Sequence, residues 1–121
     1  MSWIHSAQAD LLARYMDLAA KRQSLITSNI ANVDTPGYKT QGFDFAGEFS
    51  RAIGTSSSSQ TAVNVSDVDG LTARPDGNNV SIDREGLLLS EVQLQFGIAE
   101  QLLKSQFKNL QMAITEGGTS A

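Results

Sequence analysis

The feature that most constrains this chain is a proline–glycine turn at the end of a long helical pattern. Pro36 has no backbone N–H and disfavours helical geometry at the residue before it, so a helix that reaches this point must end. Pro36 and Gly37 match the two central positions of a type II turn, in which the second residue takes a positive φ. Asn32 and Asp34 readily bond nearby backbone groups, as a helix end requires. The sequence therefore predicts a helix stop, a sharp turn and extended chain from Tyr38.

Apolar residues recur with helical spacing over about residues 6–32, before the turn. One row repeats every seven residues and consists of Ile4, Leu11, Leu18 and Leu25. A second row beside it consists of Leu12, Ala19, Ile26 and Val33. Two such rows form a broad apolar stripe on a helix about 40 Å long. The stripe fits an ordinary bundle helix and an assembly helix equally well.

A second long helix is predicted over about residues 81–115. Ser81 suits the N-cap, and acidic residues follow it in the first turn, where the helix dipole favours negative charge. A row of apolar residues seven apart consists of Leu89, Phe96, Leu103 and Leu110. Beside this row lie Val92, Ala99, Phe107, Ala113 and Ile114. Gly97 would mark the close approach of another helix, and Gly117 and Gly118 would end this one.

The residues between the two helices carry weaker patterns. Phe43 and Phe45 alternate as one face of a short strand would. Residues 54–62 are a Ser-rich linker, and residues 63–79 are irregular and extended, with one strand or hairpin near residues 62–72. Residues 67–70 fit a turn better than a calcium loop, because the EF-hand spacing and its later Glu are missing.

These patterns predict a mainly α chain, whose long terminal helices pack as a coiled-coil-like pair around an irregular or short-β middle. Three segments follow: an N-terminal assembly helix (residues 1–33), the turn motif with an extended and flexible middle (residues 34–80), and a C-terminal assembly helix (residues 81–121). One pair of helices leaves at least half of each apolar stripe bare. We therefore expect neighbouring subunits to cover the rest.

Composition disfavours several classes of function. The chain has 121 residues, with 13 acidic and 9 basic residues and a net charge of −4, and its scattered basic residues form no nucleic-acid site. It has no Cys for a disulfide or thiolate metal site, and its one His, His5, has no catalytic companions. We expect no enzyme, cofactor or metal. The sequence has no run of roughly 20 apolar residues, so we do not expect an integral membrane protein. It shows no secretory signal pattern, so an exported role would need another export route.

The turn sequence closely resembles the N-terminal signature of the bacterial flagellar axial proteins, the family of rod, hook and hook-junction subunits. The matching motif residues are Ser28, Asn29, Ile30, Ala31, Asn32, Asp34, Thr35, Pro36, Gly37 and Tyr38. Residues 79–85 and 91–96 resemble the stretch that enters the last helix of proximal rod subunits, and residues 101–110 continue this match. The chain is short and lacks the large middle domain of distal rod and hook subunits, so within the family it is most similar to proximal rod subunits.

The resemblance implies a structural subunit of the basal-body rod in the periplasmic space, exported by the flagellar type III apparatus and assembled helically to transmit motor torque. The implied partners are copies of itself, other rod proteins, the inner-membrane ring and rod-adaptor proteins at the rod base and, in transit, the export gate. Phe45 and Phe49 resemble the Phe-x-x-x-hydrophobic element that this gate recognises. The residues expected to mediate assembly are Leu11, Leu18, Leu25, Leu89, Val92, Phe96, Leu103 and Leu110.

Two alternatives remain open on the sequence. The chain could be a soluble helical adaptor that binds one partner through its exposed stripes, or another short rod protein of the same family. An adaptor should be a compact unit that melts cooperatively, whereas a rod subunit should order fully only on assembly.

Overall fold

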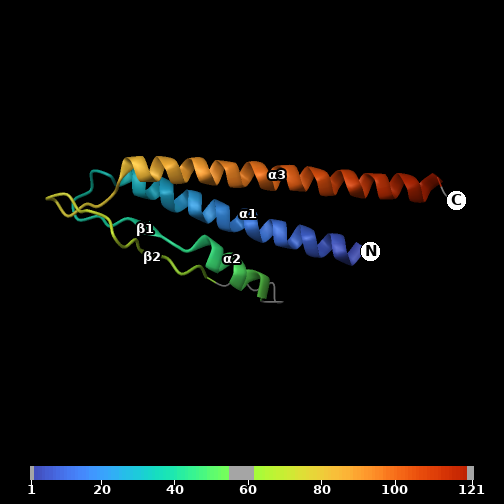
Figure 1. Cartoon of the computed structure of the whole chain (residues 1–121), viewed down its shortest axis with the longest axis horizontal. Coiled ribbons are helices and arrows are strands. Elements are labelled where there is room, and N and C mark those ends of the chain that lie inside the picture. Colours follow the sequence, from blue (N-terminus) through green and yellow to red (C-terminus); the bar gives the residue numbers. More distant parts are fainter. Residues whose placement is uncertain (1, 55–61, 120–121) are drawn as a thin grey trace.

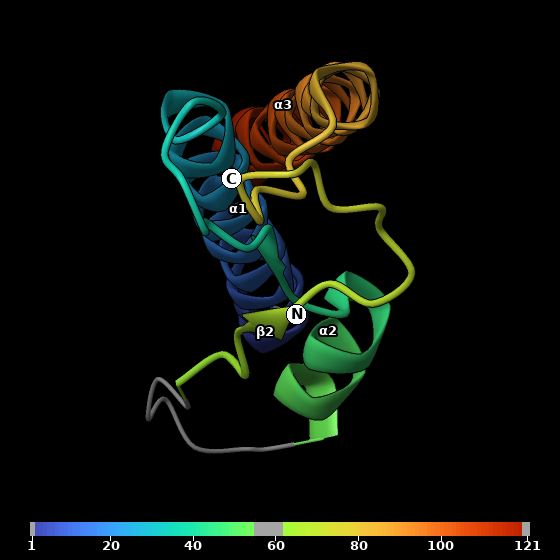
Figure 2. The same cartoon turned by 90° about the vertical axis from the view of Figure 1, so that its left-hand side faces the viewer.

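The computed structural model describes residues 2–54 and 62–119, and it contains two long antiparallel helices with a small side layer (Figure 1). The helices are α1 (Ser2–Ala31), α2 (Phe45–Gly54) and α3 (Ile82–Thr119), and the strands are β1 (Gln41–Gly42) and β2 (Ser66–Asp67). Viewed along the molecule, α3 and α2 lie on different sides of α1 (Figure 2). The predicted fold class is confirmed: a mainly helical chain with paired terminal helices and a short β element between them.

The core lies between α1 and α3. In α1 the buried apolar residues are Leu12, Ala19 and Ile26 of the second row and Leu18 of the first, all between 0 and 7% exposed. In α3 the buried apolar residues are Val92 and Ala99, which are 0% and 1% exposed. Burying a Val, Leu or Ile side chain contributes roughly 1.5–3 kcal/mol. This short core therefore supplies most of the apolar stabilisation of the helix pair.

The two helices differ from their predicted bounds in ways that have physical causes. α1 begins at Ser2 and ends at Ala31, so Val33 follows the helix. α3 continues through Gly117 and Gly118 to Thr119, so the prediction that these glycines end it was wrong; Gly costs only about 1 kcal/mol in a helix. The close approach predicted at Gly97 was also wrong within this chain, because a Cβ built there would meet no atom within 4 Å.

The start of α3 agrees with the prediction. The Ser81 hydroxyl accepts a hydrogen bond from the backbone N–H of Arg84 at 3.3 Å, as an N-cap side chain does. Asp83 and Glu85 lie in the first turn, where the positive end of the helix dipole stabilises negative charge.

The middle of the chain is where the predictions failed most. Phe45 begins α2 and belongs to no strand, because Phe45, Phe49 and Ala52 follow helical spacing and Asp44 supplies the first helical acceptor, to Glu48 N at 2.9 Å. The strand predicted near residues 62–72 is present as β2, but it forms no local hairpin. It pairs antiparallel with β1, which precedes α2 in the chain. Most of the predicted Ser-rich linker, residues 55–61, lies outside the described residues.

Beyond Ala99 the described apolar residues of α3 are exposed. Figure 1 shows α1 and α3 closest at the turn end and diverging towards the free ends, where α3 extends further. α3 has 38 residues against 30 in α1, and eight more residues add about 12 Å. Four exposed residues share one face of this part at positions i, i+4, i+7 and i+11, and we call them the α3 stripe: Leu103, Phe107, Leu110 and Ile114.

We predict that Ile26→Ala destabilises the isolated subunit by about 2–4 kcal/mol, because the residue is 3% exposed and its loss leaves a cavity. Ile98→Ala is the matched control, since Ile98 is 49% exposed on α3 and its loss should change stability by less than about 0.5 kcal/mol. Urea unfolding followed by helical circular dichroism measures both. Equal effects of the two substitutions would contradict the assigned core.

Candidate functional site

The predicted turn is present at the end of α1. Tyr38 N donates a hydrogen bond to Thr35 O at 3.2 Å, so Pro36 and Gly37 occupy the two central positions. Gly37 has φ +77°, as the second central position of a type II turn requires. A side chain at this residue would strain the backbone.

Asn32 closes the last turn of α1. Its backbone N–H donates to Ser28 O at 3.1 Å, and its side-chain amide donates to the same carbonyl at 2.8 Å. Asn32 O accepts from Thr35 N at 3.0 Å, and its side-chain oxygen accepts from the Thr35 hydroxyl at 3.0 Å. The free carbonyl of the helix end is thus satisfied locally.

Asn29 is the centre of a buried hydrogen-bond network and is 1% exposed. Its amide nitrogen donates to Gln41 O at 2.9 Å and to Glu85 Oε2 at 3.2 Å. Its amide oxygen accepts from the Tyr38 hydroxyl and from Gln41 N, both at 3.0 Å. All four hydrogen-bonding positions of the side chain are therefore used, and they join α1, the turn, β1 and α3.

Glu85 carries the charge of this network. It is 0% exposed, and its second carboxylate oxygen accepts from Arg84 Nη1 at 2.7 Å. A buried carboxylate is costly unless it is paired and hydrogen-bonded, and here it has both an ion-pair partner and an amide donor.

A second set of bonds joins the turn to the loop that precedes α3. Asn78 is 0% exposed, and its side-chain amide donates to Asn32 O and to Thr35 O, both at 2.8 Å. Its side-chain oxygen accepts from Val80 N at 2.8 Å. Arg74 donates to Val33 O and, at 3.0 Å, to Val80 O. The orphan carbonyls at the end of α1 thus find their donors in a segment more than forty residues later.

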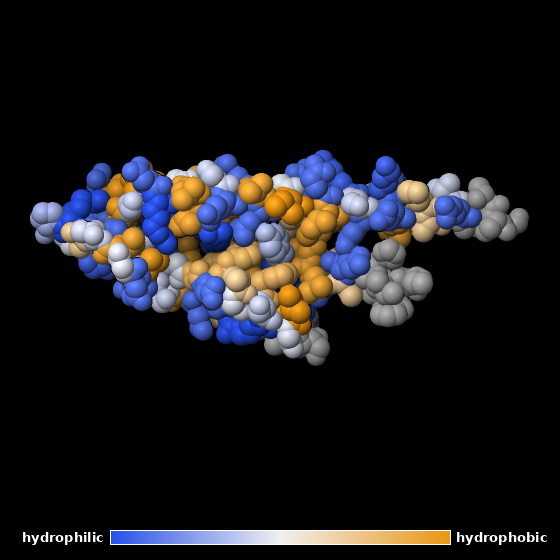
Figure 3. Space-filling model, in the orientation of Figure 1, coloured by the Kyte–Doolittle hydropathy of each residue, from blue (hydrophilic) through white to orange (hydrophobic). Residues whose placement is uncertain are grey.

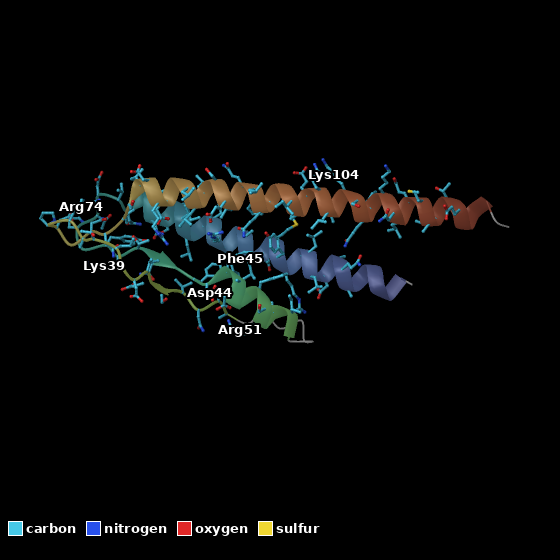
Figure 4. All side chains as sticks on the ribbon, in the orientation of Figure 1. Lys39, Asp44, Phe45, Arg51, Arg74 and Lys104 are labelled. Carbon is cyan, nitrogen blue, oxygen red and sulfur yellow. The ribbon has the colours of Figure 1, made fainter. Side chains whose placement is uncertain are left out.

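A third set of bonds runs along the chain after the turn. Gly37 N donates to Asp76 O at 2.9 Å, and Lys39 Nζ donates to Gly77 O. Thr40 N donates to the side-chain oxygen of Asn79 at 2.7 Å, and Thr40 is 0% exposed. Figure 4 shows Lys39 and Arg74 together at this end of the molecule.

We call residues 28–41 and 74–85, with these bonds, the elbow clamp. It fixes the path of the chain at the end of α1 and at the start of α3. The motif residues divide between its inside and outside: Asn29 is buried, Ile30, Asn32 and Tyr38 are half-buried, and the exposed ones are Ser28, Ala31, Asp34, Thr35, Pro36 and Gly37. The exposed motif residues can contact another protein without breaking the hydrogen bonds inside the elbow clamp.

The partners of the motif in the second half of the clamp escaped the sequence analysis. Arg74, Asn78 and Glu85 are the three side chains that hold the motif from that side. The sequence around Asn78 is typical of an ordinary turn, and Glu85 is typical of an acidic residue in the first turn of a helix. No spacing rule distinguishes a carboxylate that closes a network from one that faces solvent.

The remaining predicted residues lie along the helices. In α1, Leu18 is buried, Leu25 half-buried and Leu11 exposed; in α3, Val92 is buried, Leu89 and Phe96 are half-buried, and Leu103 and Leu110 are exposed. Phe45 and Phe49 are half-buried, with their rings stacked 6.4 Å apart and both edge-on to Tyr15 of α1. The structure thus brings the two Phe residues of the export-gate resemblance onto α1.

A small hollow lies beside the buried network. A hollow of about 70 Å³ opens beside Asn29 and Glu85, between α1, β1 and the start of α3. Small-molecule sites enclose roughly 300–1,000 Å³. In the described part of the chain no group of three His, Cys, Asp or Glu residues could hold a metal, and no helix there is long and apolar enough to cross a bilayer.

Comparison with known proteins gives one consistent result. The family described as "Flagella basal body rod protein" matches residues 16–39, which contain the end of α1 and the turn. The flagellar basal body rod protein FlgB of Borrelia hermsii is 32% identical, over 92% of this chain and 98% of that protein. FlgB of Salmonella typhimurium is 33% identical, over 85% of this chain and 88% of that protein. FlgB of Escherichia coli is 28% identical, over 84% of this chain and 88% of that protein.

We predict that Asn29→Asp destabilises the subunit by about 3 kcal/mol or more, because it removes two donors and sets a second carboxylate against Glu85. Adding Glu85→Gln should restore part of this loss, since a Gln amide can donate to the new Asp. Urea unfolding of the single and double variants measures the coupling.

Asn109→Asp is the matched control, since Asn109 is exposed on α3 and the same change there should cost less than about 0.5 kcal/mol. A double variant less stable than Asn29→Asp alone would contradict the assigned network.

Proposed function

The chain belongs to the flagellar basal body rod protein family, and we propose that it is a proximal rod subunit that assembles with copies of itself and other rod proteins through the bare apolar faces of its terminal helices. Membership of the family makes it a structural subunit of the basal-body rod. The proposal concerns its position in the rod, its contacts and its route there.

One observation carries the proposal, and it is the exposure of the α3 stripe in the described part of the chain. Leu103 and Leu110 are each 46% exposed, Phe107 63% and Ile114 66%. A soluble monomer gains nothing by exposing four large apolar side chains in a row, and such a patch is typical of a protein–protein contact. A contact between different faces of identical subunits, when its rotation does not close, generates an open helical tube.

The elbow clamp supports a role in transmitting torque. A rod must resist twisting, so each subunit needs a fixed angle between its helices and the segments that touch neighbours. The saturated Asn29 and Asn78 networks fix that angle at the end where α1 and α3 meet. Buried polar networks with every member satisfied specify one geometry and resist deformation.

Further parts of the proposal rest on the family resemblance. We propose export through the flagellar type III apparatus, with Phe45 and Phe49 read by the export gate, and contacts with the inner-membrane ring and rod-adaptor proteins at the rod base. The three segments 1–33, 34–80 and 81–121 would serve as first assembly helix, turn and middle segment, and second assembly helix. The role is structural and not enzymatic, in keeping with the dispersed titratable groups of the sequence.

We predict that Phe107→Ser leaves the subunit expressed and helical but removes it from isolated basal bodies and abolishes swimming. The residue is exposed, so the substitution should change the stability of the free subunit by less than about 0.5 kcal/mol. Lys108→Ser, at the next and also exposed position, is the control and should swim normally. Normal swimming of both variants would contradict assembly through the α3 stripe and favour a soluble adaptor.

We predict that Gly37→Val and Pro36→Ala block rod assembly while the protein is still made. Val at Gly37 would have to adopt φ +77°, and the turn that orients the clamp would change. Gly86→Val is the control for the first change, because Gly86 lies in α3 with no positive φ and with open space at its Cβ position. Soft-agar motility and immunoblots of basal bodies measure the effect. Full motility of the two turn variants would contradict the proposal that the turn is needed for rod assembly.

A further inference from the structure

Helix α2 is a small, shallowly packed element, which also bonds the segment after it through Arg51 to Ala62 O and Glu48 to Asn64 N. None of its residues is buried, and α1 is the one helix or strand of the described chain that it contacts. Tyr15 of α1 meets the rings of Phe45 and Phe49 edge-on, at 5.2 and 5.4 Å between centroids. The Arg22 guanidinium lies 5.9 Å from the centre of the Phe45 ring. Figure 4 shows Phe45 between the ribbons of α2 and α1.

The apolar face of α2 has the same pattern as the α3 stripe. Phe45, Phe49 and Ala52 stand at positions i, i+4 and i+7 of a helix, and so do Leu103, Phe107 and Leu110. In both helices the middle position of the three is Phe. The α3 stripe then continues by one more turn to Ile114, whereas α2 ends at Gly54. Both helices therefore present apolar side chains at the same spacing, and the α3 stripe is the longer of the two.

The α1 face that carries Tyr15 and Arg22 also carries apolar residues at helical spacing. Leu18 is 7% exposed, and Leu11, one heptad earlier on the same row, is 37% exposed. Figure 3 shows a hydrophobic band in the middle of this face of the molecule, between α3 and α2. A helix that replaced α2 and reached further along α1 would cover more of this band.

We propose that α2 is a displaceable cover: in the free subunit it occupies the place on α1 that the α3 stripe of a second copy takes in the assembly. The inference rests on the proposed assembly through the α3 stripe, and it adds the surface that the stripe binds and a device that keeps subunits apart before assembly. Each copy carries one stripe and one covered α1 face, so the contact is head-to-tail, and a head-to-tail contact whose rotation does not close builds an open helical array.

The competition between the two helices has a physical basis. α2 is tethered to α1 through β1, so it binds at a high effective concentration and excludes the stripe of a dilute free subunit. At a growing rod end the neighbouring stripe is held in place, and its own effective concentration rises. The longer stripe then displaces α2, because the population shifts to the state with the greater net binding free energy.

The test uses the full-length subunit and a synthetic peptide of residues 98–116. Amide hydrogen exchange is measured with and without excess peptide. We expect the peptide to bind, amides of α2 to exchange at least tenfold faster, and amides of α1 around Tyr15 to exchange more slowly. Peptide that does not bind, or that binds while α2 keeps its protection, would overturn the proposal.

Variants of the subunit sharpen the result. Phe49→Ser should release α2 and raise peptide affinity at least tenfold, whereas Ser50→Ala, at an exposed position of the same helix, should leave it unchanged. A peptide carrying Phe107→Ser should bind at least tenfold more weakly. Equal affinities for the wild-type subunit and Phe49→Ser would also overturn the proposal.

This test separates the cover from the function on which it rests. If Phe107→Ser abolishes swimming in cells but the peptide leaves α2 protected, assembly through the stripe stands and the cover is wrong. If Phe107→Ser swims normally, the proposed assembly fails whatever the peptide does.

Discussion

The side-chain amide of Asn29 is the interaction on which the architecture depends, because it uses all four of its hydrogen bonds and joins α1 to three other segments, the turn, β1 and α3. In a buried site an unpaired donor or acceptor costs about 1–3 kcal/mol, so these partners form or fail together. The apolar core of the helix pair is short, and it alone does not fix where the chain turns. Hydrophobic burial brings α1 and α3 together, whereas hydrogen bonding defines the elbow between them.

The sequence predicted the regular parts of the fold because their rules are local. Two long helices follow from heptad rows, the turn at Pro36 and Gly37 from backbone stereochemistry, and the start of α3 from its Ser81 cap. The structure of the middle of the chain could not be predicted, because contacts with residues distant in the sequence determine it. α2 forms where Phe45 and Phe49 meet Tyr15, thirty residues earlier, and β2 pairs with a strand that comes before α2. Short elements with few local signals take the structure that their tertiary contacts favour.

The candidate site likewise has one part that the sequence predicts and one part that it does not. The motif of residues 28–38 is visible in the sequence, because proline, glycine and asparagine have distinctive backbone roles. Its partners Asn78 and Glu85 are ordinary polar residues whose burial appears only in three dimensions. The proposed assembly row was only partly predictable from the sequence: heptad spacing identified Leu103 and Leu110 but could not tell which part of each row would be exposed. That depends on α3 extending beyond α1 and on the two helices diverging towards their free ends (Figure 1).

The antiparallel pairing of β1 with β2 has a consequence for how such a chain can change in length. Together with the elbow clamp, it holds both ends of residues 43–65 at one place on the framework. A loop whose ends are already joined grows at little entropic expense, about 0.6 kcal/mol for each doubling. New sequence inserted there would protrude sideways without disturbing the helical frame, so a chain of this design can acquire an additional lateral domain and keep its original backbone geometry.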